Sequence, residues 1–271
     1  MSNELEAFLE YIQVTKALSK KSCEAYKSDL LQIEELTRKP LISLDTNATL
    51  KALSSYDNKR TLNRKLSAIN AFFTFCFRSE FVQEQQKLKL AKIPKNLPKF
   101  LTYEEIQVGI KSIDQSTWIG KRDAAMILFL YATGMRISEC LNIRLEDIEG
   151  NWLRVRHGKG DKERLIPIAK EALSLLHSYL SDVPFEKEQI WLNYTGKPLS
   201  RISAFKITQK YLGVSPHVLR HSYATALILG GADLRVVQEL LGHASLLTTQ
   251  VYTHIQKQNL QETVLKHHPM A

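Results

Sequence analysis

The sequence predicts a mainly α-helical protein with a small antiparallel β-hairpin, built as an all-helical N-terminal domain followed by an α+β domain. Three observations support this fold class. Apolar residues recur at helical spacing in residues 1–80, two prolines interrupt that pattern, and two strand-like runs flank a glycine-containing turn further along. We therefore place the two domains at residues 1–97 and 98–271.

The N-terminal domain is expected to consist of several helices. The apolar positions of the first helix are Leu5, Phe8, Leu9 and Ile12. A second helix follows Ser19, a residue type that caps helix N-termini, and a shorter one is expected near 46–55. A long, well-buried helix comes next, with apolar positions Leu62, Leu66, Ile69, Phe72, Phe73 and Phe77.

The stretch KIPKNLPKF has the composition of an extended, basic linker. Pro94 and Pro98 break the helical pattern, and three lysines surround them. Thr102 and Glu105 follow with the spacing of a capping box, in which each side chain satisfies a backbone N–H of the other's segment. A new helix is therefore expected to start here.

The second domain is predicted to contain helices and one hairpin. AAMILFLYATG reads as a buried helix that ends in a turn at Gly134, and MRISECLNI reads as the next helix. WLRVRH and ERLIPI read as two strands around the turn GKGDK. Further helical patterns occupy 170–180, a stretch near 201–212, HVLRHSYATALILGG and DLRVVQELLG.

Composition narrows the functional class. The net charge of +9 favours a polyanionic partner, and both domains contribute positive charge. The sequence lacks an apolar run of about 18 residues and a signal-peptide pattern at its start. The three cysteines are too scattered for a metal site or a disulfide framework, which favours a reducing, cytoplasmic environment.

Six residues could carry chemistry, although each has an ordinary structural explanation when taken alone. They are Arg136, Lys159, His217, Arg220, His243 and Tyr252. Together they supply cations, imidazoles and one hydroxyl nucleophile, a set that suits the anionic transition state of a reaction at phosphorus. A metal site is not expected, because His217 and His221 lack the intervening glutamate of a zinc motif and a third ligand.

These six residues, in this order and at these spacings, resemble the catalytic set of the tyrosine site-specific recombinases. TGMRISECLNI, GKGDKERLIPI and PHVLRHSYATALILGGADLRVVQELLGHASLLTTQVYTHI are similar to signature segments of that family, and the last is similar to the Xer recombinases of bacteria and archaea. The resemblance is strong over residues 100–255. It implies a SAM-like, core-binding domain at residues 1–97 and a catalytic domain at 98–271, with a tail at about 256–271.

The resemblance implies a mechanism. Tyr252 would attack a DNA phosphodiester to form a 3′-phosphotyrosyl link, so that strands are exchanged through a Holliday junction without ATP, metal or other cofactor. Arg136 and Arg220 would bind the non-bridging oxygens, and Lys159 would protonate the leaving 5′-oxygen. His217 would accept the tyrosine proton or form a hydrogen bond with the phosphate, and His243 would donate a hydrogen bond to a phosphate oxygen. Glu139 matches the family's acidic position, and the resemblance implies that it supports the site without taking part in the reaction directly.

The resemblance also implies partners. The two basic domains would close around a specific duplex DNA site, with Arg64, Lys65, Lys95 and Lys99 as candidate contacts. Four protomers, of one recombinase or of two related ones, would assemble on DNA, and a DNA translocase is a candidate regulator. The tail either docks on the adjacent protomer or folds back on its own domain. No membrane partner is expected, and the protein is expected in the cytoplasm, associated with the nucleoid when bound to DNA.

Alternative functions remain open. The compact length favours Xer-like resolution of chromosome or plasmid dimers over an integrase or excisionase of a phage or mobile element. A type IB topoisomerase shares the chemistry but is disfavoured by the Xer-like last segment. An inactive DNA-binding protein would be expected to carry damage in the catalytic set, and the six positions carry none.

Overall fold

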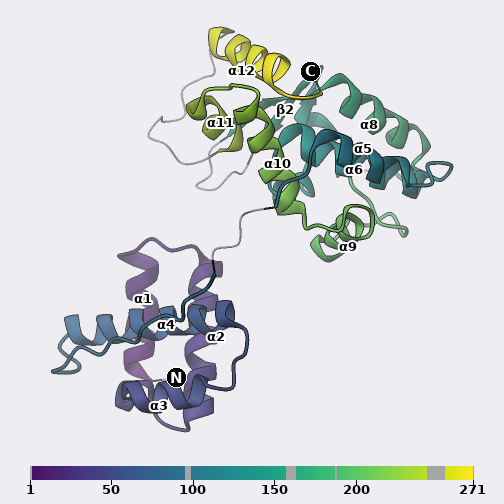
Figure 1. The fold of residues 1–271 in the computed structure, drawn as a ribbon. Helices are drawn as coiled ribbons and strands as arrows, with labels where there is room; N and C mark the ends of the chain where they lie inside the picture. Colours follow the sequence, from purple (N-terminus) through teal and green to yellow (C-terminus); the bar gives the residue numbers. More distant parts are fainter. Residues whose placement is uncertain (1, 95–98, 157–162, 187, 243–253, 271) are drawn as a thin grey trace. The chain divides into compact units, whose positions relative to one another are not determined.

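The computed structural model describes residues 2–94, 99–156, 163–186, 188–242 and 254–270, with the backbone alone for 254–259. The chain divides into two compact units, Met1–Asn96 and Leu97–Ala271, each with its own hydrophobic core (Figure 1). The structure is mostly helical with a small antiparallel sheet, which confirms the predicted fold class. None of the helices in the described residues is long and apolar enough to cross a membrane.

The N-terminal unit is helical, as predicted. Its elements are α1 (Asn3–Val14), α2 (Lys20–Thr37), the 3-10 turn η1 (Leu41–Ser43), α3 (Thr46–Leu53) and α4 (Lys59–Arg78). Phe8 of α1 meets Phe72 of α4 edge to face, with ring centroids 5.6 Å apart, and both side chains are buried. Phe77 is an exception to the expected burial of α4, because 38% of it is exposed.

Local capping explains where several helices start. The Ser19 hydroxyl accepts a hydrogen bond from the backbone N–H of Ser22, at 3.2 Å. Thr102 and Glu105 form the predicted capping box, since each side chain accepts a backbone N–H of the other residue. These short-range contacts satisfy N–H groups that would otherwise lack partners at a helix end.

The C-terminal unit contains the remaining elements of the described chain. Its helices are α5 (Tyr103–Lys111), α6 (Trp118–Thr133), α7 (Ile137–Cys140), α8 (Lys170–Asp182), α9 (Arg201–Leu212), α10 (Pro216–Leu229), α11 (Leu234–Leu241) and α12 (His254–His267). A 3-10 turn, η2 (Leu145–Asp147), precedes the sheet. Helix α6 is buried along most of its length and packs against α8 and α10, which places it at the centre of this unit (Figure 1).

Gly134 ends α6 and has to be glycine for two reasons. Its φ of +58° lies in the left-handed region, which glycine adopts without the steric cost of a Cβ. A Cβ here would also lie 2.2 Å from the ring of Tyr223 on α10. The predicted turn is therefore confirmed, and it brings the start of α7 close to α10.

The predicted hairpin is present, with one more strand than expected. Strand β2 (Trp152–Val155) pairs antiparallel with β3 (Arg164–Pro167), and Val155 lies opposite Arg164. A two-residue strand, β1 (Ile148–Glu149), pairs with the outer edge of β2 to give the order β1-β2-β3. The turn GKGDK itself lies outside the described residues.

The C-terminal tail packs on its own unit in this structure. Leu260 and Val264 of α12 are buried in a small core formed with α10 and α11. Beyond the helix, His268 is buried between the rings of Tyr131 and Tyr223. Burial lowers the pKa of His268 to about 4, so the imidazole is neutral at pH 7 and suits this apolar position.

Candidate functional site

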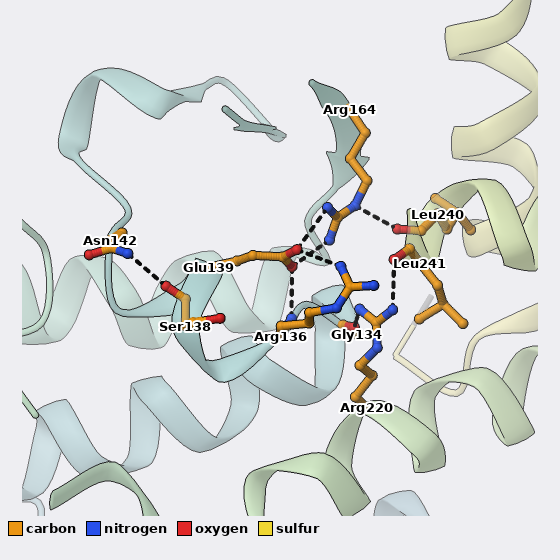
Figure 2. Close-up of polar contacts among 9 residues, drawn as sticks. All are labelled: Gly134, Arg136, Ser138, Glu139, Asn142, Arg164, Arg220, Leu240 and Leu241. Carbon is orange, nitrogen blue, oxygen red and sulfur yellow. Dashed lines mark hydrogen bonds and ion pairs between the residues drawn. The ribbon is translucent and has the colours of Figure 1, made fainter. Parts of the chain in front are cut away.

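The centre of the site is a carboxylate shared by two arginines. Glu139 on α7 accepts hydrogen bonds from Arg136, through the backbone N–H at 2.8 Å and Nη1 at 2.7 Å. The same carboxylate accepts Nη1 and Nη2 of Arg164 on β3, at 3.3 and 2.7 Å (Figure 2). Because Glu139 accepts hydrogen bonds from both the backbone and the side chain of Arg136, it orients that guanidinium.

A third arginine, Arg220 on α10, lies beside Arg136 (Figure 2). Its Nη1 donates to the carbonyl of Gly134 at 2.8 Å, and its Nη2 donates to the carbonyl of Leu241 at 2.7 Å. Burial and the nearby charge of Arg136 lower the pKa of Arg220 to about 10, so it remains charged at pH 7. Arg220 thus joins the end of α6 to the end of α11.

The cluster carries more positive than negative charge. Three guanidinium groups surround one carboxylate, whose side chain is only 6% exposed. Burial by itself raises the pKa of Glu139, but the hydrogen bonds and charge of Arg164, together with the hydrogen bonds of Arg136, outweigh it and lower the pKa to about 2. The side chain of Arg136 is 26% exposed, so the surplus charge is accessible to an anion.

The other predicted catalytic residues are only partly visible. His217 is exposed on the first turn of α10, three residues before Arg220 and hence on the same helical face. Lys159, His243 and Tyr252 lie outside the described residues, so their placement stays a prediction. Helix α11 ends at Leu241, and Gly242 closes it in the left-handed conformation, immediately before His243 in the sequence.

Sequence reasoning missed Arg164, which was read only as part of a strand. Arg164 is only 4% exposed, and its Nε donates a hydrogen bond to the carbonyl of Leu240 at 3.0 Å in addition to the contacts with Glu139. A signal was available in the strand alternation, because Arg164 and the buried Ile166 share one face of β3. A charged residue on a core-facing position needs a partner inside the protein.

The structure corrects one of the candidate DNA contacts in the N-terminal unit. Lys65 is 1% exposed, and its ammonium pairs with Asp29 at 3.1 Å and lies 5.2 Å from the centre of the Tyr56 ring. A lysine buried in this way cannot reach a phosphate. Arg64 also pairs with Asp29, but its side chain is 55% exposed.

The two candidate DNA contacts in the linker are Lys95 and Lys99. Lys99 is exposed and remains available to a polyanion, whereas Lys95 lies outside the described residues. In the part of the chain that the structure describes, no group of three or more His, Cys, Asp or Glu side chains is arranged to hold a metal ion.

Comparison with family models assigns both units. Residues 99–259 match the model described as the phage integrase family, and residues 5–80 match the N-terminal SAM-like domain of phage integrases. The first match covers the elements that carry Arg136, Glu139, Arg164 and Arg220. The second covers the helices of the N-terminal unit.

Individual relatives match along nearly the whole chain. A tyrosine recombinase XerC of Oceanobacillus iheyensis is 37% identical, over 98% of this chain and 96% of the relative. A tyrosine recombinase XerD of Listeria monocytogenes is 33% identical over the full length of both. A solved structure of the XerH site-specific recombinase bound to its difH substrate has a TM-score of 0.65 and 26% identity, and covers 96% of this chain and 83% of that one.

Proposed function

The chain belongs to the phage integrase family and is a site-specific tyrosine recombinase that cleaves and rejoins DNA strands, and on this premise we propose that it resolves chromosome or plasmid dimers as a Xer-type enzyme. The arginine cluster around Glu139 is the observation that carries the proposal for the site. It supplies accessible positive charge from two separate helices, Arg136 at the start of α7 and Arg220 on α10.

In the proposed reaction, the Tyr252 hydroxyl attacks the scissile phosphorus and the bond from phosphorus to the 5′-oxygen breaks. Tyr252 loses its proton to His217, and Lys159 gives a proton to the departing 5′-oxygen. Arg136, Arg220 and His243 hold the non-bridging oxygens, where negative charge grows in the transition state. The phosphotyrosyl bond keeps the energy of the broken bond, so rejoining needs no ATP or other cofactor.

The roles of Arg136 and Arg220 are supported by how firmly both are held. Glu139 accepts hydrogen bonds from the backbone N–H and from Nη1 of Arg136, and two backbone carbonyls accept hydrogen bonds from Arg220. Both guanidinium groups are therefore oriented before a substrate arrives. Such preorganisation is what makes charge stabilisation effective, because no reorganisation is needed during the reaction. Glu139 has a supporting role here, since its hydrogen bonds go to the arginines.

The proposed partner is a specific duplex DNA site, bound by four protomers of this recombinase or of this one and a related one. Lys95, Lys99 and Arg64 are proposed phosphate contacts, which would make binding sensitive to salt. A DNA translocase is a candidate regulator. We also propose that the protein acts in the cytoplasm, where it associates with the nucleoid when bound to DNA.

Covalent trapping tests the nucleophile and the target together. Wild type and Tyr252→Phe are incubated with nicked duplexes from the source genome, without metal or nucleotide, and DNA in SDS-resistant adducts is sequenced. We expect adducts with wild type alone, converging on one palindrome-like site in the chromosome or in a plasmid. Adducts that form equally with Tyr252→Phe would refute the mechanism.

The recovered site also separates the alternatives. Convergence on the ends of a phage or mobile element would favour an integrase or excisionase over dimer resolution. DNA binding without any adduct, even after a related recombinase from the same source is added, would identify a catalytically inactive DNA-binding protein.

A further inference from the structure

We propose that Arg164 is a positioning residue for strand cleavage, which neutralises Glu139 so that the charge of Arg136 stays available for the scissile phosphate. The inference rests on the proposed role of Arg136 as a phosphate ligand. Arg164 differs from Arg136, His217 and Arg220, the described members of the catalytic set, in being buried, with its guanidinium directed toward Glu139 and α11 (Figure 2).

Each oxygen of the Glu139 carboxylate accepts one hydrogen bond from Arg136 and one from Arg164, and Arg164 alone uses two guanidinium nitrogens. Oε1 accepts Nη1 of Arg136 and Nη1 of Arg164, and Oε2 accepts the backbone N–H of Arg136 and Nη2 of Arg164. Arg164 therefore binds both oxygens with the paired geometry that suits a guanidinium. Arg136 uses only one side-chain nitrogen on the carboxylate.

Removing Arg164 would change what Arg136 does. A buried carboxylate with one remaining cation would draw that cation fully onto itself, because an unpaired charge in the protein interior is unfavourable. Arg136 would then offer less charge to a phosphate and would point less reliably toward it. Arg164 prevents this by taking over most of the neutralisation of Glu139.

Arg164 also holds the end of α11. Its Nε donates to the Leu240 carbonyl, while Arg220 donates to the next carbonyl, that of Leu241. Gly242 follows with a φ of +66°, and a Cβ there would lie 3.0 Å from Nη1 of Arg164. The guanidinium of Arg164 thus positions both the Glu139 carboxylate, which orients Arg136, and the end of α11, which immediately precedes His243 in the sequence.

A second buried arginine provides a matched control. Arg122 on α6 is 6% exposed, pairs with Asp123 at 2.6 Å, and donates to the Leu192 carbonyl at 2.9 Å. It has the same kinds of partner as Arg164, one carboxylate and one carbonyl, but its partners do not belong to the catalytic cluster. Loss of either arginine is expected to affect folding, so folding alone cannot distinguish the two.

The experiment compares Arg164→Met with Arg122→Met on two substrates under single-turnover conditions. The substrates are nicked duplexes carrying the site recovered by trapping, one with a normal scissile phosphate and one with a methylphosphonate, which lacks one negative charge. We expect Arg164→Met to cleave the phosphate about 10–100-fold more slowly, with a much smaller loss on the methylphosphonate. Arg136→Met should show the same pattern, and Arg122→Met should slow both substrates equally.

A third substrate tests whether Arg164→Met acts by displacing Lys159, which lies five residues before Arg164 in the sequence. A duplex with sulfur in place of the leaving 5′-oxygen needs no proton donor, so it should relieve Lys159→Ala and not Arg164→Met. Relief of Arg164→Met by this substrate, or the pattern of Arg122→Met, would overturn the inference. Arg164→Lys, which keeps the charge without the paired geometry, should give an intermediate loss with the same methylphosphonate response, and serves if Arg164→Met does not fold. Wild type that forms no adduct, even after a related recombinase from the same source is added, would refute the proposed function itself, and this inference with it.

Discussion

Each unit of the molecule contains a buried carboxylate with two basic partners, but the two clusters have different consequences. In the N-terminal unit, Asp29 pairs with the fully buried Lys65 and with Arg64. In the C-terminal unit, Glu139 pairs with the buried Arg164 and the partly exposed Arg136, and Arg220 adds a further charge nearby.

The two clusters differ in whether a positive charge remains accessible at the protein surface after the carboxylate has been paired. The ammonium of Lys65 is satisfied by Asp29 and the Tyr56 ring, so it holds α4 to its neighbours. Around Glu139, the buried Arg164 pairs with the carboxylate through two nitrogens, and the side chain of Arg136 is 26% exposed, so its charge is accessible to an anion. A basic residue in a DNA-binding protein is therefore a DNA contact only if its charge is left over after the internal pairs are formed.

The largest expected effect is a loss of cleavage rate on replacing Arg220 in the C-terminal cluster. Arg220→Lys cannot span the carbonyls of Gly134 and Leu241 and also face a phosphate. We expect cleavage of a nicked site to fall by about 10²–10³-fold, in line with loss of one preorganised donor. Single-turnover adduct formation measures this, and Lys65→Met should leave the rate nearly unchanged at saturating DNA. A loss below about threefold would remove Arg220 from the phosphate-binding set.

The next effect concerns the N-terminal cluster. Lys65→Met leaves Asp29 buried with Arg64 as its remaining partner, and we expect the free energy of unfolding of that unit to fall by about 3 kcal/mol. Urea unfolding of the full chain, monitored by circular dichroism, measures it. The double variant Asp29→Leu, Lys65→Met should recover most of the loss, because an apolar pair needs no charge partner. Unaltered unfolding of Lys65→Met would reopen the possibility that Lys65 contacts DNA.

Acid provides a third test, directed at Glu139. Its folded-state pKa of about 2 lies below its ordinary value of 4.5, so its stabilising contribution is complete above pH 4.5 and is lost as the pH falls toward 2. The difference in unfolding free energy between wild type and Glu139→Gln should shrink by roughly 3 kcal/mol over that window. Urea unfolding at a series of pH values measures the difference, and a constant difference would contradict the ion-pair geometry.

The smallest effect is on salt dependence. Replacing a phosphate-contacting lysine is expected to reduce the slope of log affinity against log salt concentration by about one. Lys99→Ala should show this reduction, and Lys65→Met should keep the wild-type slope, because Lys65 is buried. Fluorescence anisotropy with the trapped site at several salt concentrations provides the slopes. Equal slopes for all three proteins would remove Lys99 from the DNA interface.

The sequence allowed good prediction where the determining contacts are local. The capping box of Thr102 and Glu105 and the turn at Gly134 depend on residues a few positions apart, and both were predicted. The pairing of Lys65 with Asp29 joins α4 to α2 across 36 positions, so it could not be read from α4 alone. Strand β1 has only two residues and depends on pairing with β2, which leaves almost no pattern to detect.

The same reasoning applies to the site. Arg136, Glu139, His217 and Arg220 were identified by motif, and the structure brings Arg136, Glu139 and Arg220 into one cluster. Arg164 was missed because its role depends on partners from α7 and α11, neither of which is near it in sequence. The period-two alternation of β3 indicated its burial but not its partners.

The arginines of the site hold α11 by its backbone, and this determines what comparison among relatives could reveal. Arg164 and Arg220 bind the carbonyls of Leu240 and Leu241, a group that nearly every residue type presents in the same place. The side chains at 240 and 241 could therefore diverge without any compensating change in either arginine. Correlated substitutions among relatives would therefore not reveal these two contacts, although they connect the arginine cluster to the segment that leads to Tyr252, the proposed nucleophile.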